Sequence, residues 1–195
     1  MGLNTIRALF DKHTITVYQA YNKNIAQLAV NSQTFVSPPF KKERMTWIKP
    51  SFLWMMYRSG WATKENQEHI LAIKIKRAGF EWALANACLS HFDSKLYSSY
   101  EEWKNLLSRL PVRVQWDPER DLKFNSLNYR TIQIGLSGIA VDLYITNWIT
   151  EITDISDLCI KTKQVLIDGK ISQAMDMLPK EETYPLPDTI ADKIR

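Results

Sequence analysis

The chain has 195 residues, of which 45% are hydrophobic and 24% are charged. This composition excludes a disordered or collagen-like protein, and the length predicts one globular domain over residues 1–195. The sequence has no run of about 18 apolar residues, and its first residues lack the apolar segment of a secretory signal. We therefore expect a cytoplasmic protein without a membrane partner. The sequence does not indicate its oligomeric state.

The two cysteines, Cys88 and Cys159, lie far apart in the chain, and each belongs to an apolar helical pattern. This placement predicts buried free thiols rather than a disulfide. The three histidines show no metal-binding spacing, so we expect no structural metal.

The net charge of +4 is concentrated in one short segment. Residues 41–58 contain five basic side chains and one acidic side chain, while the remainder of the chain holds twenty of each sign. A local excess of this kind predicts an anionic partner. A solvated basic face would give the same count, and this alternative stays open.

Hydrophobic periodicity predicts alternating strands and helices over the first two thirds of the chain. The predicted strands cover residues 14–20, 70–75, 112–116 and 129–134, and the last two form a hairpin-like pair. The predicted helices begin after Asn22, at Pro50, near Ala78 and at Ser98 or Ser99.

The last third of the sequence is predicted to be helical, over residues 139–150, 153–167 and 171–178. We expect a sheet-bearing core at about 7–138, a helical cap at about 139–180 and an extended, proline-containing tail at 181–195. This order predicts the α+β class, with a mixed, largely antiparallel sheet, flanking helices and a C-terminal helical cap.

The basic segment is the first candidate site. Arg44, Lys49 and Arg58 are set among aromatic and apolar residues, and cations held against a core need an anion. Trp47 is suited to stacking on a base or contacting a cation. Ser51 and the free amides of the helix that follows would add donors for a phosphate.

A structural explanation of the same segment is equally consistent with the sequence. The three cations would then pair with internal carboxylates such as Asp117 or Glu119, and the tryptophans would belong to the core. The two explanations differ in one respect, which is whether the cations meet acidic partners inside the protein.

Two further stretches could carry chemistry. Residues 115–121 place carboxylates beside an arginine at a strand end, where they could supply a general base or hold a ribose hydroxyl; a charged turn begun by Asp-Pro is the favoured interpretation. Residues 129–138 run through two glycines into a helix, but the spacing matches neither phosphate-binding fingerprint and favours a tight turn and helix cap. The motifs of common hydrolases, zinc peptidases and kinases are missing.

Residues 17–21, 43–61 and 114–121 resemble a widespread bacterial and fungal family that is catalogued as domain of unknown function 4291. The resemblance extends from about residue 7 to residue 194 and includes residues 83–92 and 132–138. It implies membership of this family, and it implies no activity for individual residues.

The first predicted strand and the basic segment are also similar to the opening of ADP-ribosyltransferases, which use NAD. This resemblance implies that Tyr18 and Gln19 line a nicotinamide pocket. It also implies that Arg44, Lys49 or Arg58 holds the pyrophosphate of the cofactor.

On the same resemblance, Glu119 or Gln133 stands where such a transferase has its catalytic glutamate and would polarise a ribose hydroxyl. The leading hypothesis is therefore an enzyme of the ADP-ribosyltransferase-like type that binds an anionic nucleotide-like ligand, with NAD as cofactor, in a cationic aromatic pocket. The alternative is a non-enzymatic module that binds RNA or single-stranded DNA. The balanced charge outside residues 41–58 favours a compact pocket over a long nucleic-acid track.

Overall fold

The computed structural model describes residues 3–194 of the chain. Its strands are β1 (Arg7–Ala8), β2 (Thr14–Tyr21), β3 (Thr46–Ile48), β4 (His69–Lys76), β5 (Ala87–Leu89), β6 (Val112–Arg120), β7 (Ser126–Leu136), β8 (Ile149–Asp154) and β9 (Glu182–Thr183). Its helices are α1 (Lys23–Ser32), α2 (Phe52–Ser59), α3 (Arg77–Ala85), α4 (Tyr100–Arg109), α5 (Ile139–Leu143), the π-helix η1 (Tyr144–Trp148), α6 (Ser156–Ile167), α7 (Ile171–Asp176) and α8 (Asp188–Ile194). None of the helices in this range is long and apolar enough to cross a membrane.

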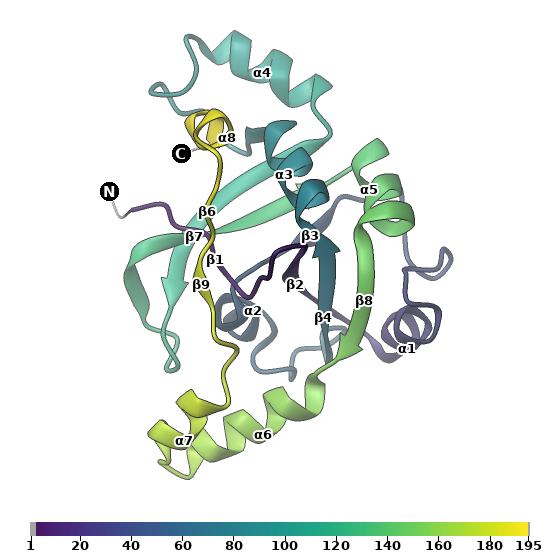
Figure 1. The fold of residues 1–195 in the computed structure, drawn as a ribbon, viewed down its shortest axis with the longest axis vertical. Helices are drawn as coiled ribbons and strands as arrows, with labels where there is room; N and C mark the ends of the chain where they lie inside the picture. Colours follow the sequence, from purple (N-terminus) through teal and green to yellow (C-terminus); the bar gives the residue numbers. More distant parts are fainter. Residues whose placement is uncertain (1–2, 195) are drawn as a thin grey trace.

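The strands form three sheets, with the orders β1-β9, β2-β4-β8 and β3-β7-β6-β5 (Figure 1). Neighbouring strands are antiparallel except β5 and β6, which are parallel. The predicted α+β class with a mixed, largely antiparallel arrangement is confirmed. In Figure 1, α6 and α7 lie at one end of the molecule, and α4 and α8 lie at the other end.

The two larger sheets are joined at one backbone bridge. Tyr18 of β2 donates its amide to the carbonyl oxygen of Lys49 at 2.7 Å, and the Lys49 amide donates back to the Tyr18 carbonyl at 3.3 Å. Because both backbone groups are paired, Lys49 is fixed in position directly after β3.

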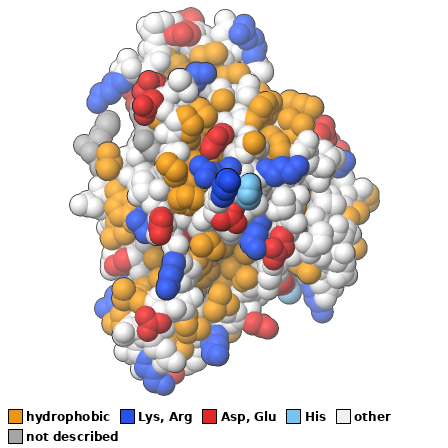
Figure 2. Space-filling view, viewed as in Figure 1, with side chains coloured by type: hydrophobic (Ala, Val, Ile, Leu, Met, Phe, Trp, Pro, Cys, Tyr) orange, Lys and Arg blue, Asp and Glu red, His pale blue; other side chains and the backbone are white. Residues whose placement is uncertain are grey.

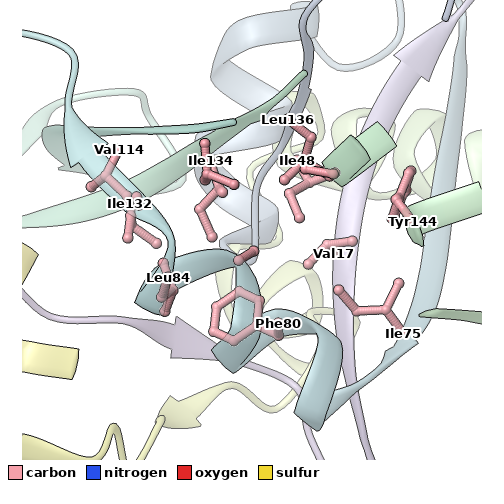
Figure 3. Packing of buried hydrophobic residues seen from close by; sticks show 14 of the residues in the cluster. Val17, Ile48, Ile75, Phe80, Leu84, Val114, Ile132, Ile134, Leu136 and Tyr144 are labelled. Carbon is pink, nitrogen blue, oxygen red and sulfur yellow. The ribbon is translucent and has the colours of Figure 1, made fainter. Parts of the chain in front are cut away.

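Helix α3 packs between the two larger sheets. Phe80 and Leu84 are fully buried, and Figure 3 shows them facing Ile132 of β7 on one side and Val17 and Ile75 on the other. Successive residues of a strand point to opposite faces. The odd-numbered residues of β6 and the neighbouring part of β7 therefore point away from this core, toward the face on which α2 lies.

Several predicted elements occur where the periodicity placed them. Asn22 caps α1 by accepting the amide of Ile25 at 3.2 Å, and Ser99 caps α4 by accepting the amide of Glu102 at 3.1 Å. The predicted hairpin is formed by β6 and β7. Cys88 and Cys159 are buried free thiols, as predicted.

The C-terminal third contains a strand where a helix was predicted. Helical structure ends at Trp148, and β8 then pairs with β4. The β-branched side chains of Ile149, Thr150, Ile152 and Thr153 favour an extended backbone, and the free edge of β4 supplies its hydrogen bonds. Residues 87–89 were likewise expected to be helical and form β5 instead.

The tail also departs from the expected extended segment. Strand β9 pairs with β1, and the chain ends in α8. Tyr184 is buried because its hydroxyl donates to Glu81 at 2.5 Å and accepts from the Nε of Arg77 at 2.9 Å. The tail thus belongs partly to the core.

Candidate functional site

A cleft of about 720 Å³ lies over the face of the four-stranded sheet that points away from α3. Its walls come from the end of β2, the loop before β3, α2 and the loop after α2. Gln115 of β6 and Gln133 of β7 form its floor as a directly paired cross-strand couple. Trp47 of β3 lies beside them, opposite Gly135. Acidic and basic side chains are mixed over the face of the molecule drawn in Figure 2, whereas the lining of the cleft is of one sign.

The charged side chains that line this cleft are all cationic. They are Lys41, Arg44, Lys49 and Arg58. Within residues 3–194, no aspartate or glutamate contributes to the lining. The six carboxamides of the lining are Gln19, Asn22, Asn66, Gln67, Gln115 and Gln133. The lining of the cleft therefore combines an excess of positive charge with many hydrogen-bonding side chains.

The three cations of the candidate site converge without acidic partners. No carboxylate oxygen in the described part of the chain lies within 4.0 Å of a charged nitrogen of Arg44, Lys49 or Arg58. Among residues 3–194, the guanidinium of Arg58 donates one side-chain hydrogen bond, to Oε1 of Gln67 at 3.5 Å. The alternative explanation, in which Asp117 or Glu119 pairs with these cations, does not hold for the described residues.

Asp117 has a different role beside the floor, on the same face of β6 as Gln115. Its two carboxylate oxygens accept the Nε2 atoms of Gln115, at 2.9 Å, and Gln133, at 2.7 Å. Both amides are thereby turned in a fixed direction, and their carbonyl oxygens have no hydrogen-bond donor within residues 3–194. These oxygens are free to accept hydroxyl groups of a ligand.

Lys49 is the deepest cation of the cleft, with only 7% of its surface exposed, whereas Lys41, Arg44 and Arg58 are exposed. Burial lowers the pKa of its amine to about 7, and the positive charge of Arg58 contributes. The negative charge of Asp117 acts in the opposite direction. An ammonium group is costly to bury without a counterion, so the neutral amine is strongly populated near neutral pH.

Gln19 lines the cleft, but its amide is already engaged. Its Nε2 donates to the hydroxyls of Thr46, at 2.7 Å, and Tyr21, at 3.0 Å, while its oxygen accepts from Tyr144 at 2.8 Å. This side chain stabilises the wall between β2 and β3. Because its amide is already hydrogen-bonded within the protein, we do not expect Gln19 to bind a ligand.

The structure does not bring Tyr18 or Glu119 into the cleft. Tyr18 is adjacent to Gln19 on β2, so its side chain points to the opposite face, where its ring lies 5.6 Å from the ring of Phe52. Glu119 lies two residues beyond Asp117, at a bulge in β6, and it lines a second cavity instead. Neither residue lines the cleft, so the candidate site does not include Tyr18 or Glu119.

The second cavity, of about 900 Å³, lies at the N-terminus of α2. Glu181 accepts the amide of Phe52 at 2.6 Å, and the Ser51 hydroxyl accepts the amide of Trp54 at 3.2 Å. These helix amides are occupied by protein side chains, which corrects the expectation that they bind a phosphate. Burial raises the pKa of Glu181 to about 8; the nearby charge of Glu119 adds to this shift, and the Phe52 amide opposes it. Sequence reasoning missed Glu181 because 129 residues separate it from Phe52.

Gln115 and Gln133 come from the two other candidate stretches, whose remaining residues do not line the cleft. Asp117 and Pro118 lie within β6, not in a turn, and the hairpin turn follows at Asp121, whose carboxylate accepts the amides of Lys123 and Asn125 at 2.8 Å each. Gly138 has a positive φ of 51° and precedes the short helix α5, in agreement with the predicted turn and cap. Neither the turn nor this glycine lines the cleft. No group of three or more metal-ligating side chains occurs in residues 3–194.

The fold and the cleft together define an α+β protein with a cationic ligand cleft on the outer face of its four-stranded sheet. The family described as "Domain of unknown function (DUF4291)" matches residues 5–184. The chain belongs to this family, which confirms the resemblance seen in the sequence. None of the curated proteins matches the chain.

Proposed function

We propose that the protein is an enzyme that binds an anionic, nucleotide-like ligand in this cationic cleft. One observation carries the proposal: every charged side chain of the lining is basic, and Arg44, Lys49 and Arg58 have no acidic partner in the described chain. A bound phosphate would supply the missing negative charge through charge-assisted hydrogen bonds.

The remaining lining favours a nucleotide over a simple inorganic anion. Trp47 is half-buried and offers an aromatic surface on which a base can stack. The oxygens of Gln115 and Gln133 are suited to accept ribose hydroxyls, because Asp117 holds their amide nitrogens on the other side. The volume of about 720 Å³ is in the usual range for small-molecule sites.

NAD is the first ligand to test, and an ADP-ribosyltransferase-like reaction is the first activity. In this proposal Arg44 and Arg58 hold the pyrophosphate, and Gln133 is the group beside the ribose. Glu119 has no part in it, because this residue lines the other cavity. Gln19 supports the wall of the site through its bonds to Thr46 and Tyr144.

Binding of RNA or single-stranded DNA is the alternative function. Trp47 and the exposed Lys41 at the cleft would suit one unstacked base and its phosphate. A nucleic-acid track would involve many phosphates, so its affinity would fall steeply with salt. A compact nucleotide pocket would show a much weaker salt dependence.

Titration calorimetry with AMP, ADP-ribose, NAD and a single-stranded oligonucleotide tests the proposal, with uncharged adenosine as the reference ligand. We expect at least one of the nucleotides to bind more tightly than adenosine. Arg44→Ala and Arg58→Ala should each weaken this binding about tenfold, which is the loss of one charge-assisted hydrogen bond. Arg109→Ala removes an exposed arginine on α4, outside the cleft, and serves as the matched control.

The proposal fails if none of the nucleotides binds, or if both cleft variants, folded by circular dichroism, bind as the Arg109→Ala control does. Tight binding of the oligonucleotide with a steep salt dependence, and no binding of the mononucleotides, would establish the alternative function instead.

A further inference from the structure

Lys49 is more buried than the other cations of the cleft, and hydrogen bonds hold its backbone in place. Only 7% of the residue is exposed, and its backbone is held on both sides by Tyr18, at the bridge between the two larger sheets. Its side chain is thus placed by rigid elements. Such placement is typical of a group that acts at a defined atom of a ligand.

In the described part of the chain, the Lys49 amine has one hydrogen-bond acceptor and one aromatic ring beside it. The Nζ atom donates to the carbonyl oxygen of Trp47 at 3.2 Å and lies 5.5 Å from the centroid of the Trp54 ring. No carboxylate oxygen in residues 3–194 is within 4.0 Å of Nζ. A neutral amine can donate one hydrogen to the Trp47 carbonyl and keep its lone pair for a ligand.

The surrounding charges act in opposite directions, and the effect of Arg58 is the larger of the two. Arg58 of α2 is the cation whose charge disfavours protonation of Lys49, and Asp117 of β6 is the carboxylate whose charge favours it. Asp117 is already bound by Gln115 and Gln133, so it does not reach Nζ as an ion-pair partner. Desolvation together with a neighbouring cation is an established way to activate a lysine as a nucleophile.

We propose that Lys49 is the nucleophilic amine of the cleft and forms an imine with the aldehyde carbon of a ribosyl phosphate ligand. This inference rests on the proposed function, because it requires an anionic, nucleotide-like ligand in the same cleft. The amine adds to the aldehyde carbon to give a carbinolamine. The oxygen then leaves as water with both hydrogens of the amine, and a C=N bond replaces the C=O bond. The step requires no oxidant or reductant.

The cleft contains the groups that a ribosyl phosphate needs. Arg44 and Arg58 bind the phosphate, and the carbonyl oxygens of Gln115 and Gln133 accept the sugar hydroxyls. The reducing end of such a sugar opens to an aldehyde. Ribose 5-phosphate and ADP-ribose share this chemistry, and the larger ligand adds an adenine that can stack on Trp47.

Reductive trapping tests the proposal on the full chain. The protein is incubated with cyanoborohydride and ribose 5-phosphate, ADP-ribose or unphosphorylated ribose, and the modified residue is identified by peptide mass spectrometry. We expect both phosphorylated sugars to modify Lys49 at least about tenfold faster than Lys41, which lines the same cleft but is exposed. Unphosphorylated ribose should react slowly, and excess AMP, which has no aldehyde, should protect Lys49. The sugar that reacts faster identifies the source of the ligand.

Two variants keep the test independent of folding. Lys49→Arg places a permanent cation at this position and Lys49→Met retains an apolar stem; both should lose the adduct while Lys104→Arg, at an exposed position on α4 outside the cleft, keeps it, with folding checked by circular dichroism. Equal modification of Lys49 and the exposed lysines, or an unchanged adduct in Lys49→Arg, overturns the inference. If AMP binds to the wild type in calorimetry but Lys49 is not modified, this inference alone fails. If no nucleotide binds, the proposed function itself fails.

Discussion

Trp47 packs its indole over the backbone of Gly135, the residue directly opposite it in the sheet. A Cβ atom at position 135 would lie 3.0 Å from Cζ2 of Trp47 and 2.5 Å from Sδ of Met45. These distances are shorter than ordinary van der Waals contacts, so the glycine leaves the space that Trp47 and Met45 occupy.

Gly135→Ala should therefore displace Trp47 and weaken nucleotide binding. We expect about a tenfold loss of affinity in calorimetry and a loss of about 1–2 kcal/mol in the free energy of unfolding, as for other overpacked sites. Met45→Ala, combined with Gly135→Ala, should restore part of the stability, because it removes the flexible side chain of the closer contact. Unchanged affinity and stability in Gly135→Ala would contradict the role of this packing.

Lys49→Met should stabilise the protein near neutral pH while it abolishes imine formation. The folded-state pKa of Lys49 is about 7 and the ordinary value is 10.5, so between these values the unfolded chain binds more protons. Wild-type stability should accordingly rise with pH across this window. We expect the variant to be at least about 1 kcal/mol more stable at neutral pH, with a smaller gain at higher pH.

Denaturant unfolding at several pH values measures this difference. Lys41→Met is the matched control, since Lys41 lines the same cleft but is exposed. The prediction is wrong if the Lys49 and Lys41 variants change stability equally at every pH.

Glu181→Gln should remove a pH-dependent loss of stability. The carboxyl has a folded-state pKa of about 8 against an ordinary value of 4.5, so the folded protein holds the extra proton between these values. Wild-type stability should fall as the pH rises through this window, and above it the full cost of the buried charge remains. Glutamine keeps an oxygen to accept the Phe52 amide and has no charge to bury.

Thermal unfolding at acid and alkaline pH checks this prediction. The gain of Glu181→Gln over wild type should be larger at alkaline pH, by about 1 kcal/mol or more. Glu182→Gln alters the exposed neighbouring carboxylate and should give no such trend. A difference in stability between Glu181→Gln and wild type that is the same at all pH values would contradict the raised pKa of the Glu181 carboxyl.

Asp117→Asn should loosen the floor of the cleft and lower the pKa of Lys49 further. An asparagine cannot accept both amide nitrogens of Gln115 and Gln133 without turning its own NH₂ group toward one of them. Nucleotide affinity should fall about fivefold, and the pH profile of reductive trapping should move to lower pH, because Asp117 is the charge that raises this pKa. Asp142→Asn on α5, an exposed position, provides the control for loss of one negative charge. A trapping profile that does not move would contradict the coupling between Asp117 and Lys49.

The sequence alone determined those helices and strands that are specified by patterns of neighbouring residues. Apolar periodicity and capping side chains predicted α1, α4 and the β6–β7 hairpin, because a strand or a helix buries one face and its pattern can be read within a dozen residues. The basic segment at 41–58 was also visible as a charge excess. Lys49 was selected together with Arg44 and Arg58 because of its apolar neighbours, and only the structure showed that Lys49 is buried while the two arginines are exposed.

The tertiary structure decided which distant residues meet. β8 is a strand because the free edge of β4 was available, and Glu119, at a bulge in β6, lines a different cavity from Gln115 of the same strand. The lack of an acidic partner for Arg44, Lys49 and Arg58 is likewise a property of three-dimensional packing. The sequence pattern indicates which cationic side chains need a negatively charged partner. Only the folded structure shows whether the protein itself supplies that partner.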